Sequence, residues 1–490
     1  MTLIKNNRRN FLGMGVGLAG AVPLSYLNAA PSNPSRPPKS LPKRGMVLFK
    51  GGYVITMDAE LGEIADADVL VKDGKIISVG KNLLAPGARI VNAKNMIVMP
   101  GLVETHWHMW NSLLRSMAGD AVCCGYFPTS AGLGKFFVPS DMYAGVRLAA
   151  AEAIDSGITT IHDWAHNPRT PEHARENLRA LRESGIRARF SYGPARGIPV
   201  SETVNIDDIK ALHADWKNHS NEGLISLGLA WRGVQYAVTD PATGRVGFQA
   251  IPEAVYRKEY DAARSLGIPL TAHCNIGTKV DFGHVTKLDQ LGLLYEDLQL
   301  VHMVSTTPAE IEMVAKAGSS VSFSPYTEMR TGFGFPDPMA FAKAGIRVGL
   351  SVDTTTLSGS ANMFEIMKGI QNIANGRDLS EYAMPAKTAL EMGTLGGARS
   401  LGLGQQTGSL KPGKVADVIM IDTQVLNIGM FTDAPHMVVE AANPASVKMV
   451  MVDGRILKEN GRLTAVNAAE VITDASMANM AVRKRANWRY

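Results

Sequence analysis

Two histidines that lie one residue apart, His106 and His108, follow a short apolar segment that begins after Met99-Pro100-Gly101. In an extended strand, residues i and i+2 face the same side, so both imidazoles point in one direction. Two neutral imidazoles on one face supply half of a tetrahedral metal site. An isolated histidine on an apolar strand is more often a packed core residue, so the pair gains weight only if further ligands converge on it.

Three later segments share this design, in which an apolar strand ends in a side chain that can bind a metal. These end residues are His273, His302 and Asp353. Helix-like stretches that close on glycine or polar residues alternate with the strands, as at residues 308–317 and 338–344. Parallel strands that alternate with helices and end in polar residues are typical of a barrel whose chemistry lies at its C-terminal face.

The chain between His108 and Asp353 contains enough apolar segments to test this prediction. Its length is close to the ~250 residues that are typical of a (β/α)8 barrel. Eight strands are predicted, at residues 102–105, 158–162, 187–192, 224–230, 268–272, 298–301, 320–324 and 347–352.

This constellation resembles the metal-dependent amidohydrolase superfamily, in its cytosine-deaminase-like and triazine-hydrolase branch. That branch carries His-x-His after strand one, His after strands five and six, and Asp after strand eight. The five positions are filled here by His106, His108, His273, His302 and Asp353.

The flanking segments extend the resemblance over residues 46–462. Residues 47–58 and 68–79 resemble the first strands of the family's small β-domain, and residues 408–418 resemble the segment that returns the chain to it. Residues 361–367 resemble the helix that follows strand eight.

The predicted fold is therefore α/β, a (β/α)8 TIM barrel with a small composite β-sandwich domain formed by N- and C-terminal segments. The predicted parts are a twin-arginine signal peptide at 1–30, a Pro-rich linker at 31–45, the N-terminal part of the sandwich at 46–98, the barrel at 99–405, the C-terminal part of the sandwich at 406–465, and a helix or tail at 466–490.

The resemblance implies a division of labour at the site. His106, His108, His273 and Asp353 would hold one divalent metal ion, with Zn²⁺ preferred and Fe²⁺ or Co²⁺ as alternatives. Metal binding brings the pKa of a bound water towards neutrality. As catalytic residues, Asp353 would accept the proton of that water and relay it to the leaving group, and His302 would polarise the substrate atom under attack.

The fourth predicted strand bears on the number of metal ions. Binuclear members of the superfamily bridge two ions with a modified lysine there, and residues 224–232 contain no lysine. Arg232 cannot replace it, because a guanidinium stays protonated and only donates hydrogen bonds. The sequence therefore predicts a mononuclear site.

The chain departs from the branch three residues beyond His273. Aminohydrolases of this branch usually carry a glutamate there, which moves a proton to a ring nitrogen, and this chain carries Ile276. Because isoleucine cannot transfer a proton, ordinary cytosine, guanine or adenosine deamination is disfavoured. Three residues could replace the carboxylate from elsewhere: Asp281, His284 and Glu328. We prefer Glu328, whose alternative role is a surface pair with Arg330.

Aromatic residues gather where the mouth of the barrel is predicted. Four of the six tryptophans come just after barrel strands, which suits a flat or largely apolar substrate. A role in covering the barrel rim is the alternative. The Gly-rich segment 119–138 is expected to form a long loop and lid. The candidate substrate-binding residues are Trp110, Trp164, His166 and Glu328.

These features predict a mononuclear hydrolase that cleaves a non-peptide C–N bond in a small cyclic or aromatic molecule. An amide, carbamate or lactam-like bond suits the missing glutamate, because Asp353 alone can pass the proton to nitrogen. Hydrolytic dechlorination or thiol displacement, and heteroaromatic deamination, are alternatives on the same site. A catalytically dead periplasmic binding protein is a remote alternative. A homo-oligomer is compatible with the sequence, although no motif demonstrates one.

The basic charge is concentrated at the N-terminus. Of a formal net charge of +5 over 490 residues, residues 1–45 supply seven lysines and arginines and no acids, which argues against a nucleic-acid-binding body. The segment Asn7-Arg8-Arg9-Asn10-Phe11-Leu12 resembles a twin-arginine export signal. The apolar run 12–27 is too short and glycine-rich for a stable membrane anchor. We expect export of the folded protein by the twin-arginine machinery to the periplasm or outside the cell.

Overall fold

The computed structural model describes residues 40–239, 246–277 and 281–488. The predicted export signal and most of the predicted linker lie outside the described residues. The remaining predicted parts can be compared with the structure.

Eight parallel strands form the central sheet, in the order of the chain, and each pairs with its neighbour in parallel. A parallel bridge between Trp107 and Asp353 brings the first strand to the end of the last and nearly closes the barrel. The eight predicted strands are thereby confirmed. They are β6 (Leu102–Trp107), β7 (Ile158–Ala165), β8 (Arg187–Tyr192), β9 (Ile225–Ala230), β12 (Leu270–Cys274), β13 (Leu298–His302), β14 (Ser320–Phe323) and β15 (Val348–Leu350).

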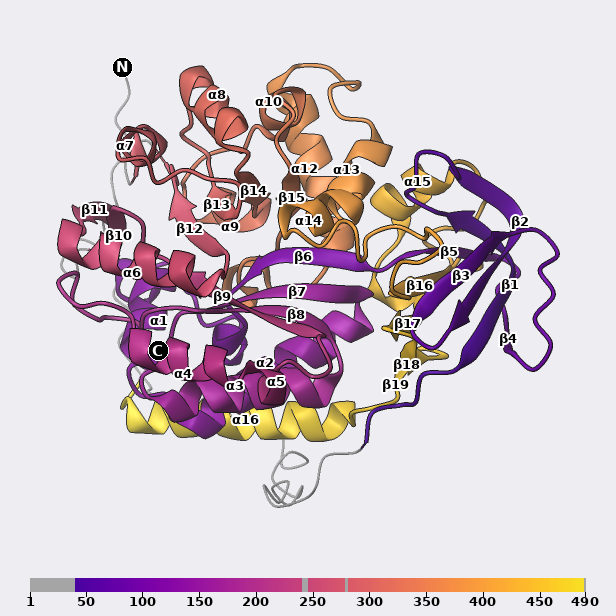
Figure 1. Cartoon of the computed structure of the whole chain (residues 1–490), viewed down its shortest axis with the longest axis horizontal. Helices are drawn as coiled ribbons and strands as arrows, with labels where there is room; N and C mark the ends of the chain where they lie inside the picture. The colour runs from indigo at the N-terminus through magenta and orange to yellow at the C-terminus, as the bar shows by residue number, and fades with distance from the viewer. Residues whose placement is uncertain (1–39, 240–245, 278–280, 489–490) are drawn as a thin grey trace, which may run out of the picture. The chain divides into compact units, whose positions relative to one another are not determined.

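Helices cover the outside of this sheet, as Figure 1 shows. Their ends follow from local sequence: α8 (Pro308–Ala317) begins with a capping box of Thr307 and Glu310 and ends at Gly318, whose φ of +70° favours glycine. The predicted helices at 308–317 and 338–344 are confirmed as α8 and α10 (Pro338–Lys343). The other barrel-layer helices include α2 (Pro139–Asp155), α3 (Pro171–Ser184), α4 (Ile206–Ala214), α5 (Trp216–His219), α6 (Glu253–Leu266), α7 (His284–Gln290), α9 (Pro325–Arg330), α11 (Thr355–Ser358), α12 (Met363–Arg377), α13 (Ala386–Met392) and α14 (Leu395–Ser400).

Two insertions lie above the C-terminal ends of the strands. The first follows β6 and contains η2 (Met109–Leu114), η3 (Val122–Cys124) and α1 (Tyr126–Gly134). The second is the antiparallel hairpin of β10 (Gln235–Thr239) and β11 (Val246–Ala250), which follows β9. Both insertions contribute residues to the cavity described below.

A nine-stranded sheet forms the second domain and draws on both ends of the chain. Strand β5 (Met96–Pro100) pairs antiparallel with β16 (Val418–Asp422), which joins the N-terminal and C-terminal segments within one sheet. The predicted composite domain is therefore present. Its other strands are β1 (Met46–Ile55), β2 (Glu63–Lys72), β3 (Lys75–Gly80), β4 (Arg89–Asn92), β17 (Val447–Val452), β18 (Arg455–Glu459) and β19 (Arg462–Leu463), and α15 (Ala434–His436) lies between β16 and β17.

The two domains meet through a close backbone junction and a buried ion pair. A single residue, Gly101, separates β5 from β6, and a Cβ added there would lie 2.1 Å from side-chain atoms of Thr159. Arg187 on β8 donates two hydrogen bonds to Asp417, at 2.7 Å and 3.1 Å, and both side chains are buried. The site-bearing strand β6 is thus fixed directly to the smaller sheet.

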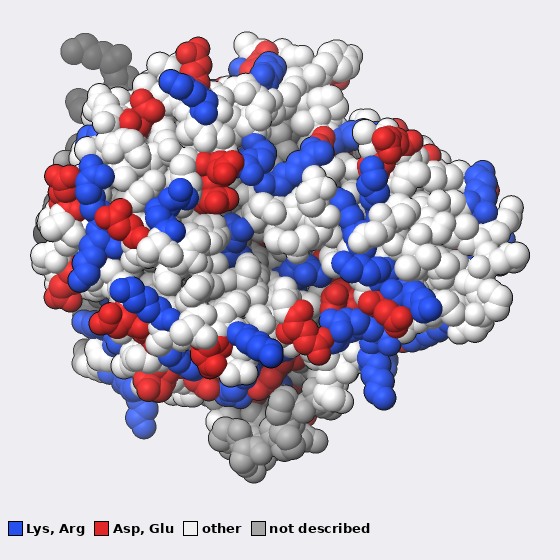
Figure 2. Space-filling view, viewed as in Figure 1, with Lys and Arg blue, Asp and Glu red and all other residues white. Residues whose placement is uncertain are grey.

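The C-terminal helix α16 (Ala468–Arg485) packs against α2 (Figure 1), where Arg147 and Asp474 form an ion pair at 2.6 Å. Figure 2 shows that basic and acidic side chains are interspersed over the visible face. Within the described residues, no helix combines the length and apolar character needed to cross a bilayer. The three cysteines, Cys123, Cys124 and Cys274, are free.

Candidate active site and metal centre

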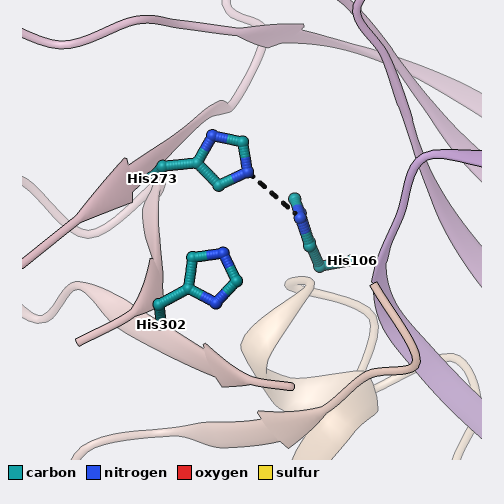
Figure 3. Close-up of side chains that lie close together, drawn as sticks. All are labelled: His106, His273 and His302. Atoms are coloured by element: carbon teal, nitrogen blue, oxygen red, sulfur yellow. Dashed lines mark hydrogen bonds between the residues drawn. The ribbon is translucent and has the colours of Figure 1, made fainter. Parts of the chain in front are cut away.

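Four side chains predicted as metal ligands converge at the C-terminal ends of β6, β12 and β15. The Nε2 atoms of His106 and His108 each lie 3.3 Å from Oδ1 of Asp353. Nε2 of His273 lies 3.3 Å from Nε2 of His106, the contact drawn in Figure 3. Ligand atoms of a tetrahedral site with bonds of about 2.0–2.1 Å are themselves separated by about 3.3 Å. These three separations are those expected around one small divalent cation. The ligand atoms fall into two close groups that share His106: His106, His108 and Asp353 form one, and His106, His273 and His302 form the other.

The protonation of these groups agrees with a metal site. Burial lowers the pKa of His106 and of His273 well below the ordinary value, and lowers the pKa of His108 to about 3, so all three imidazoles are neutral. Oδ1 of Asp353 is buried and accepts no hydrogen bond from the described residues. Neutral imidazole nitrogens and a carboxylate oxygen are preferred ligands of divalent zinc-like ions. The donor set thus fits the expected group.

Neighbouring groups orient the ligands. Nδ1 of His108 lies 3.1 Å from the carbonyl oxygen of Trp164, so it acts as the donor and leaves Nε2 free for a metal. Asp353 itself has a φ of +57°, in the left-handed region that strains a non-glycine residue. Hydrogen bonds from its N–H to Ser351 Oγ (2.7 Å) and to its carbonyl from the N–H of His108 (2.7 Å) hold this conformation.

Beneath the ligands lies a buried carboxylate that the sequence did not single out. Glu104 on β6 accepts hydrogen bonds from the backbone N–H groups of His106 (3.2 Å) and Val352 (3.1 Å). It thereby ties the strand of one ligand to the backbone just before Asp353. Burial raises the pKa of Glu104 to about 8. The Glu104 side chain therefore bridges β6 and the segment that follows β15, and it helps to set the distance between them.

His302, at the end of β13, stacks on His273 with ring centroids 5.3 Å apart. The close-up in Figure 3 shows it beside the two ligand imidazoles. Its Nδ1 lies 3.2 Å from Oε1 of Glu328. Burial alone would lower the pKa of His302, but the hydrogen bond to Glu328 and the nearby Asp353 carboxylate raise it above its ordinary value. His302 is therefore well placed to donate a proton or a hydrogen bond to a substrate atom.

Glu328 occupies a different place from the one expected of a substitute for the missing glutamate. It is fully buried, accepts a hydrogen bond from the N–H of Ser324 (2.7 Å), and lies behind His302 rather than in the cavity wall. It is not paired with Arg330, whose guanidinium donates to the carbonyl oxygens of Leu357 and Ala118. Both expected roles of Glu328, as substrate contact and as surface residue, are replaced by a role in positioning His302.

A cavity opens over the ligands, and it combines aromatic walls with a few polar groups, as small-molecule sites do. Aromatic side chains form much of its wall, and Ile276 lies in it as well. The lining residues are His108, Tyr126, Phe127, His166, Arg196, Trp231, Arg232, Gln235, Tyr236, Ala237, His273, Ile276, Asp281, His302, Thr327, Thr331, Phe333 and Asp353.

Trp110 and Trp164 are predicted to contact substrate, but in the structure they lie behind the histidines that line the cavity. Trp164 packs on His273 with ring centroids 4.2 Å apart, and Trp110 donates from Nε1 to Nδ1 of His166 at 3.2 Å. Neither indole is among the lining residues, so both support histidines that are. Nδ1 of His166 also lies 3.3 Å from the carbonyl oxygen of Trp164, a contact that requires the proton on Nδ1, so these two contacts of Nδ1 favour opposite tautomers. Of the four candidate substrate contacts, the structure places His166 in the cavity wall.

Several lining residues were missed by sequence reasoning. Tyr126 and Phe127 belong to the segment predicted as a lid, so their aromatic character there was an available signal. Arg196 follows β8 and bonds to the hydroxyls of Ser130 (2.9 Å) and Tyr236 (3.4 Å). Its place depends on the hairpin after β9, and no local pattern predicts that contact.

The fold and the site together define a metal-dependent hydrolase of the (β/α)8 barrel class. A family model described as "Amidohydrolase family" matches residues 97–457, and the chain belongs to this family. The protein is thus an amidohydrolase, a divalent-metal hydrolase that acts on carbon–nitrogen bonds other than peptide bonds.

Curated relatives cover nearly the whole chain. A 5′-deoxyadenosine deaminase of Methanosarcina mazei is 28% identical and is matched over 90% of this chain and 99% of its own length. A 5-methylthioadenosine/S-adenosylhomocysteine deaminase of Nitratidesulfovibrio vulgaris is 29% identical, over 85% of this chain and 93% of its own.

Solved structures share the fold. An adenosine deaminase from Xanthomonas campestris with bound zinc is similar with a TM-score of 0.76 and 24% identity, covering 90% of this chain and all of that one. Atrazine chlorohydrolase from Arthrobacter aurescens, complexed with zinc, is similar with a TM-score of 0.73 and 20% identity, covering 89% of this chain and all of that one.

Proposed function

We propose that this amidohydrolase uses a single zinc ion to hydrolyse a C–N bond in a small, flat, cyclic or aromatic molecule. The observation that carries the proposal is the convergence of His106, His108, His273 and Asp353. Three pairs of their ligand atoms, His106–Asp353, His108–Asp353 and His106–His273, are each 3.3 Å apart, as expected around one tetrahedral ion. Strand β9 offers no lysine to bridge a second ion. An ion held there supplies an activated water at neutral pH.

The chain's own residues would share the remaining work. Asp353 is placed to take up a proton from the attacking water and to deliver it to the departing nitrogen. His302, held by Glu328, is placed to donate to the substrate atom on which negative charge develops. His166 lines the cavity and offers a ring nitrogen to a polar atom of the substrate.

The leading bond is that of an amide, a carbamate or a lactam. Ile276 lies in the cavity wall at the place where a proton-carrying glutamate is expected, so the ring nitrogen of a heteroaromatic amine would lack that proton donor. A carbonyl group needs only polarisation of its oxygen and protonation of its nitrogen. His302 and Asp353 meet these two needs.

Heteroaromatic deamination is the second candidate. It is supported by the curated relatives, which are named as deaminases of adenosine derivatives. Displacement of chloride is a third, supported by the name of the structurally similar atrazine chlorohydrolase. A non-catalytic binding protein is disfavoured because every ligand position and His302 are filled.

We also propose that the protein is exported folded, with its metal, to the periplasm or outside the cell. The support is the sequence Arg8-Arg9 followed by an apolar run. Fusing residues 1–45 to a reporter that is active only after export tests this. Export should be lost when both arginines are changed to lysine, and a reporter exported equally well with lysines contradicts the proposal.

One experiment separates the three reactions. The zinc-loaded protein is assayed with matched panels of aryl amides and carbamates, 6-aminopurine nucleosides that include 5′-deoxyadenosine, and chlorotriazines. Turnover confined to the first panel supports the leading proposal. Turnover of the nucleosides at comparable kcat/KM replaces it with deamination, and release of chloride alone replaces both.

A further inference from the structure

The cavity contains a buried carboxylate that the proposed chemistry does not use. Asp281 is 4% exposed, lines the same cavity as His302 and Asp353, and comes seven residues after Cys274, the last residue of β12. The backbone groups of Gly277 and Asp281 bond to each other, at 2.8 Å and 3.3 Å. Ser305 Oγ adds a hydrogen bond to the carbonyl of Asp281 at 2.9 Å. The position of Asp281 is therefore fixed by the fold.

One chain of donors reaches Oδ1 of Asp281. Lys287 donates from Nζ to Oε1 of Gln235, and Gln235 donates from Nε2 to Oδ1. The orientation of the Gln235 amide follows from chemistry, because an ammonium only donates and a carboxylate only accepts. Gln235 is 2% exposed and begins strand β10 of the hairpin.

A second chain of donors reaches Oδ2. The backbone N–H of Val234 donates to Nε2 of His284 at 3.1 Å, so that nitrogen carries no proton. The neutral ring then carries its proton on Nδ1, which donates to Oδ2 of Asp281 at 3.3 Å. Gly233 makes room for this contact, since an added Cβ there would lie 2.5 Å from Nε2 of His284. Both series of hydrogen bonds end on the side chain of Asp281, which is their common acceptor.

Each oxygen of the Asp281 side chain thus accepts one hydrogen bond, from Gln235 on Oδ1 and from His284 on Oδ2. Each carboxylate oxygen has two lone pairs, and each chain uses only one. A second lone pair on each oxygen therefore remains for a ligand. Two parallel acceptor sites on one planar group match a pair of N–H donors on another planar group.

The surrounding wall suits such a planar group. Trp231, Tyr236 and Phe333 line the same cavity, and their faces and edges favour a flat, conjugated partner. Ile276 adds an apolar surface between His273 and the loop of Asp281. The cavity therefore combines one anionic acceptor with an otherwise largely aromatic and apolar wall.

We propose that Asp281 is the residue that determines substrate specificity, by accepting two hydrogen bonds from a planar substrate group with paired N–H donors, such as an amino-substituted heterocycle or an amidine. It binds and orients the substrate and does not carry the proton that the missing glutamate would carry. This inference rests on the proposed function only in taking the cavity as the substrate site.

The first test uses the zinc-loaded protein and benzamidine, a flat probe with paired N–H donors, in a calorimetric titration. Asp281→Asn should bind benzamidine about 10- to 100-fold more weakly than the wild type, the range for loss of a hydrogen bond to a charged group. Asp289→Asn removes the same charge from an exposed position on α7 and should bind as the wild type does. Equal binding by Asp281→Asn and the wild type overturns the proposal.

A second measurement needs no variant and so does not depend on the folding of Asp281→Asn. N,N-dimethylbenzamidine keeps the ring and the charge but lacks the donor pair, and it should bind the wild type about tenfold more weakly than benzamidine. Equal affinity for both probes would show that the site recognises only the positive charge of the ligand, and it would overturn the paired-donor proposal. Because no turnover is measured, failure of the proposed reaction and failure of this inference are distinguishable.

Once a substrate with paired N–H donors is found, kinetics give a third test. Asp281→Asn should raise KM about 10- to 100-fold with kcat within about threefold of the wild type, as expected when a binding interaction is removed. A fall in kcat at unchanged KM would assign Asp281 the role of proton carrier and overturn the specificity role.

Discussion

Glu328 bonds to His302 from the side away from the cavity, with its Oε1 atom 3.2 Å from Nδ1 of the imidazole. The carboxylate therefore fixes which ring nitrogen faces the substrate and supports the charged form of the ring. A mutation of Glu328 can therefore weaken His302 as a catalytic group and leave the metal ligands unchanged.

Glu328→Gln should lower kcat about 10- to 100-fold and leave metal content unchanged, because it removes the charge that supports His302 but keeps the size of the side chain. Steady-state kinetics with metal analysis on the same sample check this. Glu312→Gln, an exposed change on α8, is the matched control and should be silent. Loss of the metal from Glu328→Gln would show instead that Glu328 supports the ligand set.

His273→Ala should lose both the metal and turnover, because it removes one of four ligands and the ring on which His302 stacks. Metal analysis of the purified wild type should give about one equivalent per chain. His213→Ala, at an exposed position on α4, should retain both. Full activity in a metal-free preparation of either protein would refute the metal-based mechanism.

The buried carboxyl of Asp163, on β7, makes stability depend on pH. Burial raises its pKa to about 7, although a hydrogen bond from Nδ2 of Asn177 at 2.5 Å opposes this. Between the unfolded-state pKa of about 4 and the folded-state value, the folded protein binds the extra proton, so stability falls as pH rises through this window and is constant above it.

Asp163→Asn removes that titration. The variant should be as stable as the wild type near pH 4 and more stable by roughly 1–4 kcal/mol at pH 8. Thermal unfolding at both pH values measures the difference, with the exposed Asp289→Asn as a control of equal charge. A variant that is less stable than the wild type at pH 8 would mean that the ionised carboxylate is well solvated or paired.

The buried ion pair of Arg187 and Asp417 joins the two domains. Mutations of its two partners should therefore have non-additive effects on the free energy of unfolding. Asp417→Ala should lower the free energy of unfolding by about 3–5 kcal/mol, because it leaves a buried guanidinium without its partner. The double variant Arg187→Met/Asp417→Leu should recover most of this loss. Denaturant unfolding measures both. Equal losses in the single and double variants would show that packing and not charge dominates.

Much of the barrel and the ligand set could be predicted because their signals are local. A strand with period two places His106 and His108 on one face, and each remaining ligand directly follows an apolar run. Strand β15 is shorter than predicted and ends at Leu350. Beyond it, the Ser351 N–H still bonds to the carbonyl oxygen of Phe323 on β14 at 2.9 Å. The Ser351 hydroxyl donates to the carbonyl oxygen of His106, and the Val352 N–H donates to Glu104.

The roles of the carboxylates could not be predicted in the same way. Glu328 was placed correctly just after strand seven, but its partner lies 26 residues earlier in the chain. Asp281 gains its role from Gln235, which comes from a hairpin 46 residues away. Trp110 and Trp164 were placed near the mouth by their position after strands, while rotation of each indole relative to the cavity depends on packing with His166 and His273.

The single-glycine connection at residue 101 has a consequence for how the two domains can move. Strand β5 of the smaller sheet and strand β6 of the barrel are one residue apart, and that residue has no space for a side chain. A linker this short and this closely packed leaves no room for a flexible hinge at this point, so the two sheets are expected to move as one body here.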